Sequence, residues 1–340
     1  MKKNNEFEIN ELSQATKVSM RTRIISAIVA CIIIFPLLFL GDWFFFALIA
    51  FVAVVAAIEI VNCAKPRHSS WLYIGTIVLI LFLTFWPVLR QLFFALFKSA
   101  GWKLWTSFET IYISVIVLVA SIFLSFMFVV IDKDTTVGDA SFIFTTSIIV
   151  SLGLQACLFL RYYPIIDVYG YVSGDALPDV GYFNFFENFS SSMLLCFVGL
   201  ATFMTDIGAY FTGVLFGKHK MNERISPKKT WEGFVGGVVM SFVFGFSFAF
   251  FMALGGHPIL SILDINHWYY ILILCLAIPF ISTLGDFVFS SFKRYYGIKD
   301  FGKIMPGHGG ALDRIDSLVF SMIFSALFIC IIAGREIPLL

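Results

Sequence analysis

Residues 290–316 read SSFKRYYGIKDFGKIMPGHGGALDRID and lie between two long apolar segments, 268–290 and 317–334. The stretch gathers cations, glycines and carboxylates. Each flanking segment is long enough to cross a hydrocarbon core of roughly 30 Å. A polar stretch held between two such segments predicts chemistry at the surface of a membrane.

The composition is that of an integral membrane protein. Apolar residues make up 59% of the 340-residue chain, charged residues only 13%, and 42 residues are phenylalanine. A soluble globular protein of this size could not keep so much apolar surface in water. The six cysteines stand singly, without metal-like spacing, and are interpreted as core residues. We therefore expect an all-α, polytopic transmembrane helical protein.

About nine segments qualify as membrane spans by length and hydropathy. They are residues 24–40, 43–63, 71–89, 109–131, 140–160, 191–216, 233–254, 268–290 and 317–334. Only Gly41 and Asp42 separate the first two segments, so a tight helical hairpin is an alternative there. The Phe-rich piece 91–97 also suits the membrane interface.

The basic residues are distributed unevenly between the two sides that nine spans define. Eighteen of the 23 fall on the side of the N-terminus, and the other five are Arg90, Lys98, Lys103, Arg161 and Arg335. Because loops rich in lysine and arginine stay in the cytoplasm, we expect a cytoplasmic N-terminus and an external C-terminus. The expected location is the cell (inner or plasma) membrane.

The expected spans and their orientation together suggest four parts of the chain. They are a cytoplasmic tail (1–22), N-terminal membrane helices with about five spans (23–163), an extracytoplasmic loop (164–190) and a C-terminal catalytic membrane domain (191–340). The last part carries two loops that we expect on the cytoplasmic face, 217–232 and 291–316.

Three carboxylates, Glu59, Asp206 and Asp286, fall inside expected spans, where an ionisable group is costly and indicates function. Glu59 lies near the end of its span, where pairing with Lys65 or Arg67 is an equally good explanation. Asp206 stands among small residues, which favour either a packing seam or a site. Asp286 is expected on the same side of the membrane as Asp206 and at a similar depth. A site shared by the two aspartates is therefore the preferred interpretation.

The loop 217–232 carries hydroxyls and cations immediately before an expected helix. Ser226, Lys228, Lys229 and Thr230 follow this order around Pro227. Such a helix start commonly holds a phosphate, although lysines there can also simply anchor a loop to anionic lipid. The glycine spacing of a P-loop is absent, so a soluble-type nucleotide fold is not indicated.

The loop 291–316 combines positive charge with a glycine-rich turn and two aspartates. Lys293, Arg294, Lys299 and Lys303 supply the charge, and Gly309 and Gly310, next to His308, offer exposed backbone to a ligand. Asp313 and Asp316 open the last helix on one face and can hold one or two magnesium ions. A helix start stabilised by its dipole is the simpler alternative. His308 receives only a supporting role.

The order of these residues resembles a family signature. Serine, Lys293–Arg294, Lys299–Asp300, the PGHGG turn of 306–310 and the DRID of 313–316 are similar to the signature of phosphatidate cytidylyltransferases, also called CDP-diacylglycerol synthases. The similarity extends to the Asp206 region and to 226–233, which together cover about the last 150 residues.

The resemblance implies transfer of CMP from CTP to phosphatidic acid, giving CDP-diacylglycerol and pyrophosphate, with Mg²⁺ required and K⁺ assisting. It implies that Asp286, Asp313 and Asp316 bind metal. The expected catalytic residues are these three aspartates together with Lys293 and Arg294. The expected substrate-binding residues are Asp206, Ser226, Lys228, Lys229, Thr230, Lys299, Lys303, His308, Gly309, Gly310 and Arg314.

Two other functions remain open from the sequence. A CTP-dependent polyprenol or lipid kinase would use a similar loop, and an ion-coupled transporter would use Asp206 and Asp286 as an ion path. The transporter is disfavoured because the densest group of polar residues lies in a loop. Small residues at Gly236 and Gly237 permit a homodimer or packing within one chain, and we expect no nucleic-acid partner.

Overall fold

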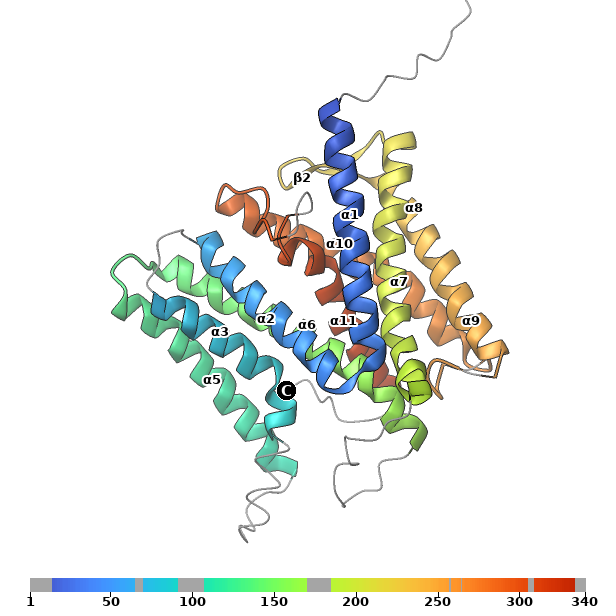
Figure 1. Ribbon diagram of the computed structural model, residues 1–340, viewed down its shortest axis with the longest axis horizontal. Helices are drawn as coiled ribbons and strands as arrows, with labels where there is room; N and C mark the ends of the chain where they lie inside the picture. Colours follow the sequence, from blue (N-terminus) through green and yellow to red (C-terminus); the bar gives the residue numbers. More distant parts are fainter. Residues whose placement is uncertain are drawn as a thin grey trace, which may run out of the picture.

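The computed structural model describes residues 14–64, 70–90, 107–169, 185–256, 258–263, 265–304 and 309–333. These residues fold almost entirely into helices (Figure 1). The helices are α1 (Gln14–Leu40), α2 (Asp42–Ala64), α3 (Ser70–Thr84), α5 (Ser107–Ile131), α6 (Val137–Tyr169), α7 (Phe185–Phe216), α8 (Trp231–Ser241), the π-helical turn η1 (Phe242–Phe246), α9 (Ser247–Leu254), α10 (Trp268–Tyr295) and α11 (Leu312–Ile332).

Within these described ranges, six helical segments are long and apolar enough to cross a membrane. They are Trp43–Ala64, Val137–Pro164, Ser191–Phe216, Trp231–Leu254, Trp268–Tyr295 and Leu312–Ile332. Three shorter apolar helices, Ile28–Leu40, Ser70–Thr84 and Val115–Ile131, fall on the remaining apolar segments. The prediction of an all-α polytopic membrane protein is therefore confirmed, whereas nine spans stays a prediction.

A small β-hairpin, which the sequence did not predict, interrupts the helical architecture. Strand β1 (Lys220–Asn222) pairs antiparallel with β2 (Ser226–Thr230), with Lys220 opposite Thr230. The strands are too short to give a periodic signal in the sequence. The hairpin fills the connection between α7 and α8, so the segment expected as a loop has a defined shape.

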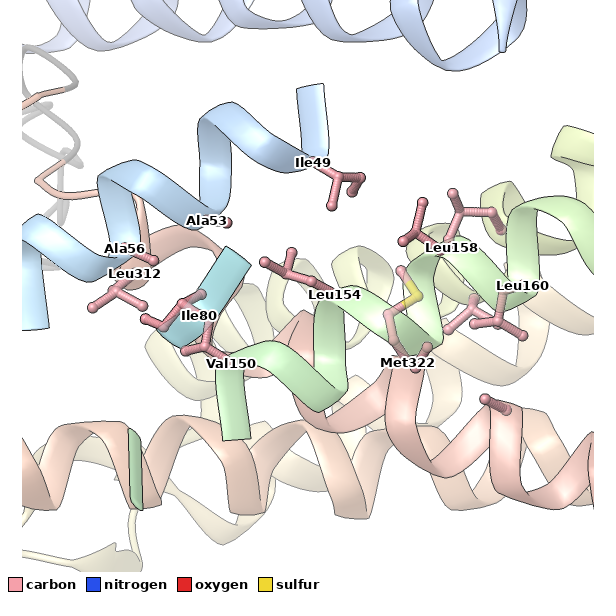
Figure 2. Close-up of a cluster of buried hydrophobic side chains, with 14 of the residues drawn as sticks. Ile49, Ala53, Ala56, Ile80, Val150, Leu154, Leu158, Leu160, Leu312 and Met322 are labelled. Atoms are coloured by element: carbon pink, nitrogen blue, oxygen red, sulfur yellow. The ribbon is translucent and has the colours of Figure 1, made fainter. Parts of the chain in front are cut away.

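Helix α6 lies at the centre of the helical packing and contacts α2, α3, α5, α7 and α11. Figure 2 shows Val150 and Leu154 of α6 among Ala53 of α2, Ile80 of α3 and Leu312 of α11. Small residues let helix backbones approach closely, and close packing drives helix association where lipid is as apolar as the core. Because Leu312 and Ala53 belong to one buried cluster, the start of α11 lies in the same core as α2.

Polar side chains cover backbone carbonyls that prolines release. Pro279 has no N–H for the carbonyl of Cys275 four residues earlier; Ser241 Oγ of α8 donates to that carbonyl at 3.3 Å. Gln155 Nε2 of α6 donates to the Leu83 carbonyl, four residues before Pro87. An unsatisfied carbonyl is costly in a membrane, so these contacts stabilise the helices near their prolines.

The span expected over residues 140–160 belongs to a longer helix, so Arg161 lies inside that helix and not after its end. Helix α6 continues to Tyr169, and the Arg161 side chain is fully buried within it. Its Nε donates to the Leu38 carbonyl at 3.1 Å, at the end of α1, and its Nη1 donates to Ser191 Oγ of α7. The last carbonyls of a helix lack partners within it, which gives a buried guanidinium something to bind.

Gly236 and Gly237 are buried against α7 of the same chain. A Cβ on Gly236 would lie 2.0 Å from Thr212 Oγ1, and one on Gly237 would lie 2.7 Å from the Thr205 carbonyl oxygen. These glycines serve packing within one chain, the second of the two alternatives. They give no support to a homodimer, which stays a prediction.

Candidate active site

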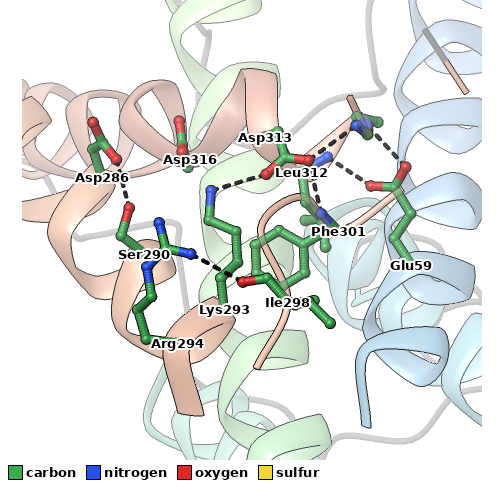
Figure 3. Close-up of polar contacts among 12 residues, drawn as sticks. Glu59, Asp286, Ser290, Lys293, Arg294, Ile298, Phe301, Leu312, Asp313 and Asp316 are labelled. Atoms are coloured by element: carbon green, nitrogen blue, oxygen red, sulfur yellow. Dashed lines mark hydrogen bonds and ion pairs between the residues drawn. The ribbon is translucent and has the colours of Figure 1, made fainter. Parts of the chain in front are cut away.

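The hairpin and the end of α10 meet through an ion pair. Lys229 Nζ of β2 lies 2.5 Å from Asp286 Oδ2 of α10 and 4.8 Å from the centre of the Phe287 ring. Ser290 Oγ, one turn further along α10, donates to Asp286 Oδ1 at 3.0 Å (Figure 3). The structure thus brings together the two polar segments that the sequence analysis singled out.

Three helices each contribute one carboxylate to this place. Asp206 of α7, Asp286 of α10 and Asp316 of α11 are close enough for their charges to interact. Lys229 and Arg314 are the cations that act on Asp206. Asp316 is buried, and its Oδ1 accepts the Ser317 N–H at 2.7 Å, whereas Asp206 is exposed. The expected neighbourhood of Asp206 and Asp286 is therefore present.

Arg294 links the hairpin to the last polar segment. Its Nε donates to the Ile225 carbonyl at 3.2 Å, in the hairpin turn, and its Nη1 donates to the Ile298 carbonyl at 3.1 Å. A planar guanidinium can hold two acceptors in a fixed geometry. In this arrangement Arg294 fixes the relative position of the two segments, and a catalytic role for it stays a prediction.

Asp313 is the centre of a buried polar cluster (Figure 3). Lys293 Nζ lies 2.9 Å from Asp313 Oδ1, and their side chains are 10% and 4% exposed. Asp313 Oδ2 accepts the N–H groups of Phe301 at 2.8 Å and Gly310 at 2.9 Å. Both oxygens therefore have donors, so binding of a metal by Asp313 would compete with these contacts.

Glu59 belongs to the same cluster, and its contact with the start of α11 was not predicted from the sequence. Its Oε1 accepts the Ala311 N–H at 2.9 Å, and its Oε2 accepts the Leu312 N–H at 2.8 Å. Figure 3 shows this carboxylate, from α2, facing the start of α11. Lys65 and Arg67, the expected partners, lie outside the described residues. The sequence showed only that Glu59 is an acidic residue inside an expected span. It gave no indication of which helix the Glu59 carboxylate would contact.

Thr230 ends the hairpin and begins α8. Its Oγ1 accepts the Gly233 N–H at 3.1 Å, a capping contact that satisfies one free N–H of the helix start. A Cβ on Gly217 would lie 2.8 Å from Thr230 Oγ1, and one on Gly213 would lie 3.2 Å away. The hydroxyl is thus buried between α7 and α8, and contact with a substrate stays a prediction.

Glu232, in the first turn of α8, holds the other end of the hairpin. Its carboxylate accepts the backbone N–H of Lys218 at 3.1 Å and contacts His219 Nδ1 at 2.5 Å. The Trp231 N–H donates to the His219 carbonyl at 2.9 Å. The lysines of β2 therefore stand on a segment that is fixed at both ends.

Tyr296 connects the end of α10 to α6. Its hydroxyl donates to Asp139 Oδ1 at 3.3 Å, and the Asp139 Oδ2 accepts from Thr136 at the start of α6. Burial, followed by the nearby Asp139 charge, raises the pKa of Tyr296 above its ordinary value. The hydroxyl donates because its partner is a carboxylate, which only accepts.

The other expected site residues differ in exposure. Lys228, Lys299, Lys303 and Arg314 are exposed, and Ser226 is half-buried. Gly309 has a φ of +91°, which favours glycine, whereas Gly310 is buried with its N–H donated to Asp313. The exposed backbone expected at Gly310 is therefore not found. His308 lies outside the described residues.

The positions of the carboxylates bear on whether this place could hold magnesium. No group of three or more His, Cys, Asp or Glu side chains in the described part of the chain is arranged to hold a metal ion. Magnesium, however, usually takes one or two carboxylates together with substrate phosphates and water. Asp286, like Asp313, has a donor at each oxygen, but its side chain is 26% exposed against 4% for Asp313. Asp286 and its electrostatic neighbour Asp316 therefore fit that donor set better than Asp313.

The fold and this arrangement define a polytopic membrane protein that gathers carboxylates from three membrane helices, together with nearby cations, in one place. The chain belongs to the cytidylyltransferase family, whose profile matches residues 21–332.

Curated relatives named phosphatidate cytidylyltransferase are similar to part of the chain. Proteins of Staphylococcus haemolyticus and Staphylococcus epidermidis are 38% and 40% identical to it over 146 residues, and one of Staphylococcus aureus is 39% identical over 147 residues. Each match covers 43% of this chain and 52% of the relative. The chain thus matches about half the length of these relatives.

Proposed function

We propose that this protein transfers CMP from CTP to phosphatidic acid, giving CDP-diacylglycerol and pyrophosphate. The observation that carries the proposal is the Lys229–Asp286 ion pair, which joins a cationic hairpin to carboxylates of three membrane helices. The family and the printed name of the relatives support the same reaction.

The reaction needs little beyond positioning and charge neutralisation. A phosphate oxygen of phosphatidic acid forms a bond to the α-phosphorus of CTP while the bond to the β,γ-pyrophosphate breaks. The attacking monoester is already anionic, so a general base is not required. The exposed Lys228, Lys299 and Arg314 are suited to hold the phosphates of the substrates.

Magnesium is the cofactor that we propose, and K⁺ is a second candidate. Bound Mg²⁺ would neutralise charge on the phosphate oxygens during displacement. Asp286 and Asp316 would hold it, with Asp313 as a third candidate whose present contacts favour a structural role. Lys229, now paired with Asp286, would be free to bind phosphate when a metal takes its place.

The same proposal includes the topology. We place the site at the cytoplasmic face of the cell membrane, with the N-terminus on that side, because basic residues concentrate in the segments that would lie there. CTP would then enter from the cytoplasm, whereas phosphatidic acid would come from the bilayer past the exposed Asp206.

The decisive experiment supplies the purified protein with phosphatidic acid, Mg²⁺ and CTP labelled at the α-phosphorus. Transfer of label into the lipid supports the proposal. A lipid kinase would instead move only the γ-phosphate, so label from γ-labelled CTP in the lipid would contradict it. Ion movement in liposomes without any CDP-lipid would favour a transporter.

A further inference from the structure

We infer that Glu59 is a positioning residue for the proposed reaction, since its carboxylate fixes where α11 begins. The inference rests on the proposed function only for its catalytic consequence. Oε1 and Oε2 accept the N–H groups of Ala311 and Leu312 at 2.9 Å and 2.8 Å. A carboxylate at a helix N-terminus satisfies free N–H groups and complements the helix dipole.

Two glycines make room for this carboxylate. A Cβ on Gly302 would lie 2.3 Å from Glu59 Oε1, and one on Gly310 would lie 2.5 Å from it. Glu59 itself is 4% exposed. The last polar segment is therefore shaped around the Glu59 side chain, because any larger residue at either position would displace it.

The contacts continue from Glu59 to the candidate active site. Asp313 directly follows Ala311 and Leu312, whose N–H groups donate to Glu59. Its carboxylate accepts the Gly310 N–H and forms an ion pair with Lys293. Asp316 follows on the next turn of α11. A shift in the start of α11 would therefore move Asp313 and Asp316 together.

The same contacts exclude one way of binding phosphate. A glycine-rich turn before a helix commonly presents its N–H groups to a phosphate. Here the N–H groups of Gly310, Ala311 and Leu312 are all donated to protein carboxylates. These three N–H groups therefore hold the start of α11 in place and are not available to a substrate phosphate in this arrangement.

The test compares the detergent-solubilised wild-type protein with the variants Glu59→Ala, Glu59→Gln and Glu59→Asp. Asn62→Ala is the control variant. Asn62 lies one turn along α2 and accepts a hydrogen bond from Tyr73 of α3, away from α11. Gln keeps one acceptor oxygen, whereas Asp ends roughly 1.5 Å short of the N–H groups. Hydrogen exchange of 309–316 and steady-state kinetics are measured on the folded fraction.

We expect Glu59→Ala to speed exchange at 309–316 about tenfold or more, without a change at 320–332. We expect kcat to fall roughly 100-fold, as misplacement of reacting groups does, with KM for CTP within about threefold. Glu59→Gln should give intermediate values, Glu59→Asp should resemble Glu59→Ala, and Asn62→Ala should match the wild type.

Unchanged exchange at 309–316 in Glu59→Ala would overturn the inference, as would faster exchange with an unchanged kcat. If the wild-type protein transfers no CMP, the proposed function fails, and positioning for that reaction fails with it. The exchange data would still decide whether Glu59 holds the start of α11, so the two failures are distinguishable.

Discussion

Lys229 Nζ and Asp286 Oδ2 lie 2.5 Å apart and join β2 to α10, with side chains that are 25% and 26% exposed. A partly exposed ion pair adds little to folding stability. Substitutions at these two residues therefore test the chemistry of the site rather than the fold.

Lys229→Met should raise KM for CTP about tenfold with a smaller change in kcat, because the ammonium is proposed to bind phosphate. Initial rates at varied CTP measure this. Lys220→Met, on the paired strand of the same hairpin, is the matched control and should leave KM unchanged. An unchanged KM in Lys229→Met would remove this lysine from nucleotide binding.

Asp313→Asn and Asp316→Asn should both abolish CDP-lipid formation but differ in stability. Asp313→Asn leaves the buried Lys293 ammonium without its carboxylate, which costs about 3 kcal/mol. Asp316→Asn removes no ion pair of this kind and should keep a wild-type Tm. Thermal unfolding in detergent separates the two.

A double variant sharpens this comparison. Asp313→Asn combined with Lys293→Met should recover much of the lost stability, because no buried charge remains unpaired, yet stay inactive. Full activity in either single variant would remove that aspartate from the proposed mechanism.

Gly302→Ala should lower both stability and kcat, because its Cβ would meet Glu59 Oε1 at 2.3 Å. An overpacked buried site typically costs about 1–3 kcal/mol. Gly199→Ala, in α7, is the control, since its Cβ would meet only Phe203 Cε2 at 4.0 Å. Equal behaviour of the two variants would mean that the segment near Gly302 adapts without disturbing Glu59.

Ser241→Ala should destabilise the protein by about 0.6 kcal/mol, the average value of a hydrogen bond between membrane helices. In Pro279→Ala, residue 279 regains an N–H for the Cys275 carbonyl, so the added Ser241→Ala should cost less. A double-mutant cycle of thermal or denaturant unfolding measures the coupling. No coupling would show that Ser241 does not serve the carbonyl released by Pro279.

Removal of divalent cations with a chelator should abolish CMP transfer, and Mg²⁺ should restore it. Mg²⁺ should also raise the Tm of the wild type but not of Asp286→Asn or Asp316→Asn, since a ligand stabilises only a protein that binds it. A full thermal response in both variants would place the metal elsewhere.

Much of the fold could be predicted because membrane helices are encoded locally. Each of the nine apolar segments overlaps a helix, and the final helix starts beside Asp313 as expected. The hairpin was missed because strands as short as Lys220–Asn222 have no clear period. Arg161 was expected after the end of its helix because an arginine usually marks a loop, whereas here carbonyl and hydroxyl acceptors compensate its burial.

The site was predictable only where its contacts are local or its charges complementary. The spacing of Asp313 and Asp316 placed both at the helix start, and the contacts with Gly310 and Ser317 are local. The contacts of Asp313 with Lys293 and Phe301, 20 and 12 residues away, come from folding. The Glu59 contacts join positions more than 250 residues apart. Nothing in either local sequence specifies that pairing.

The burial of Thr230 between α7 and α8 has a consequence for how the site could close. The hairpin is bound to these two helices through Thr230, Gly217 and Glu232, so Lys228 and Lys229 cannot swing as a free loop. Asp286 and Asp316 belong to another pair of packed helices, α10 and α11. A change in the distance between Lys229 and Asp286 larger than side-chain rotation allows would therefore require one helix pair to shift against the other.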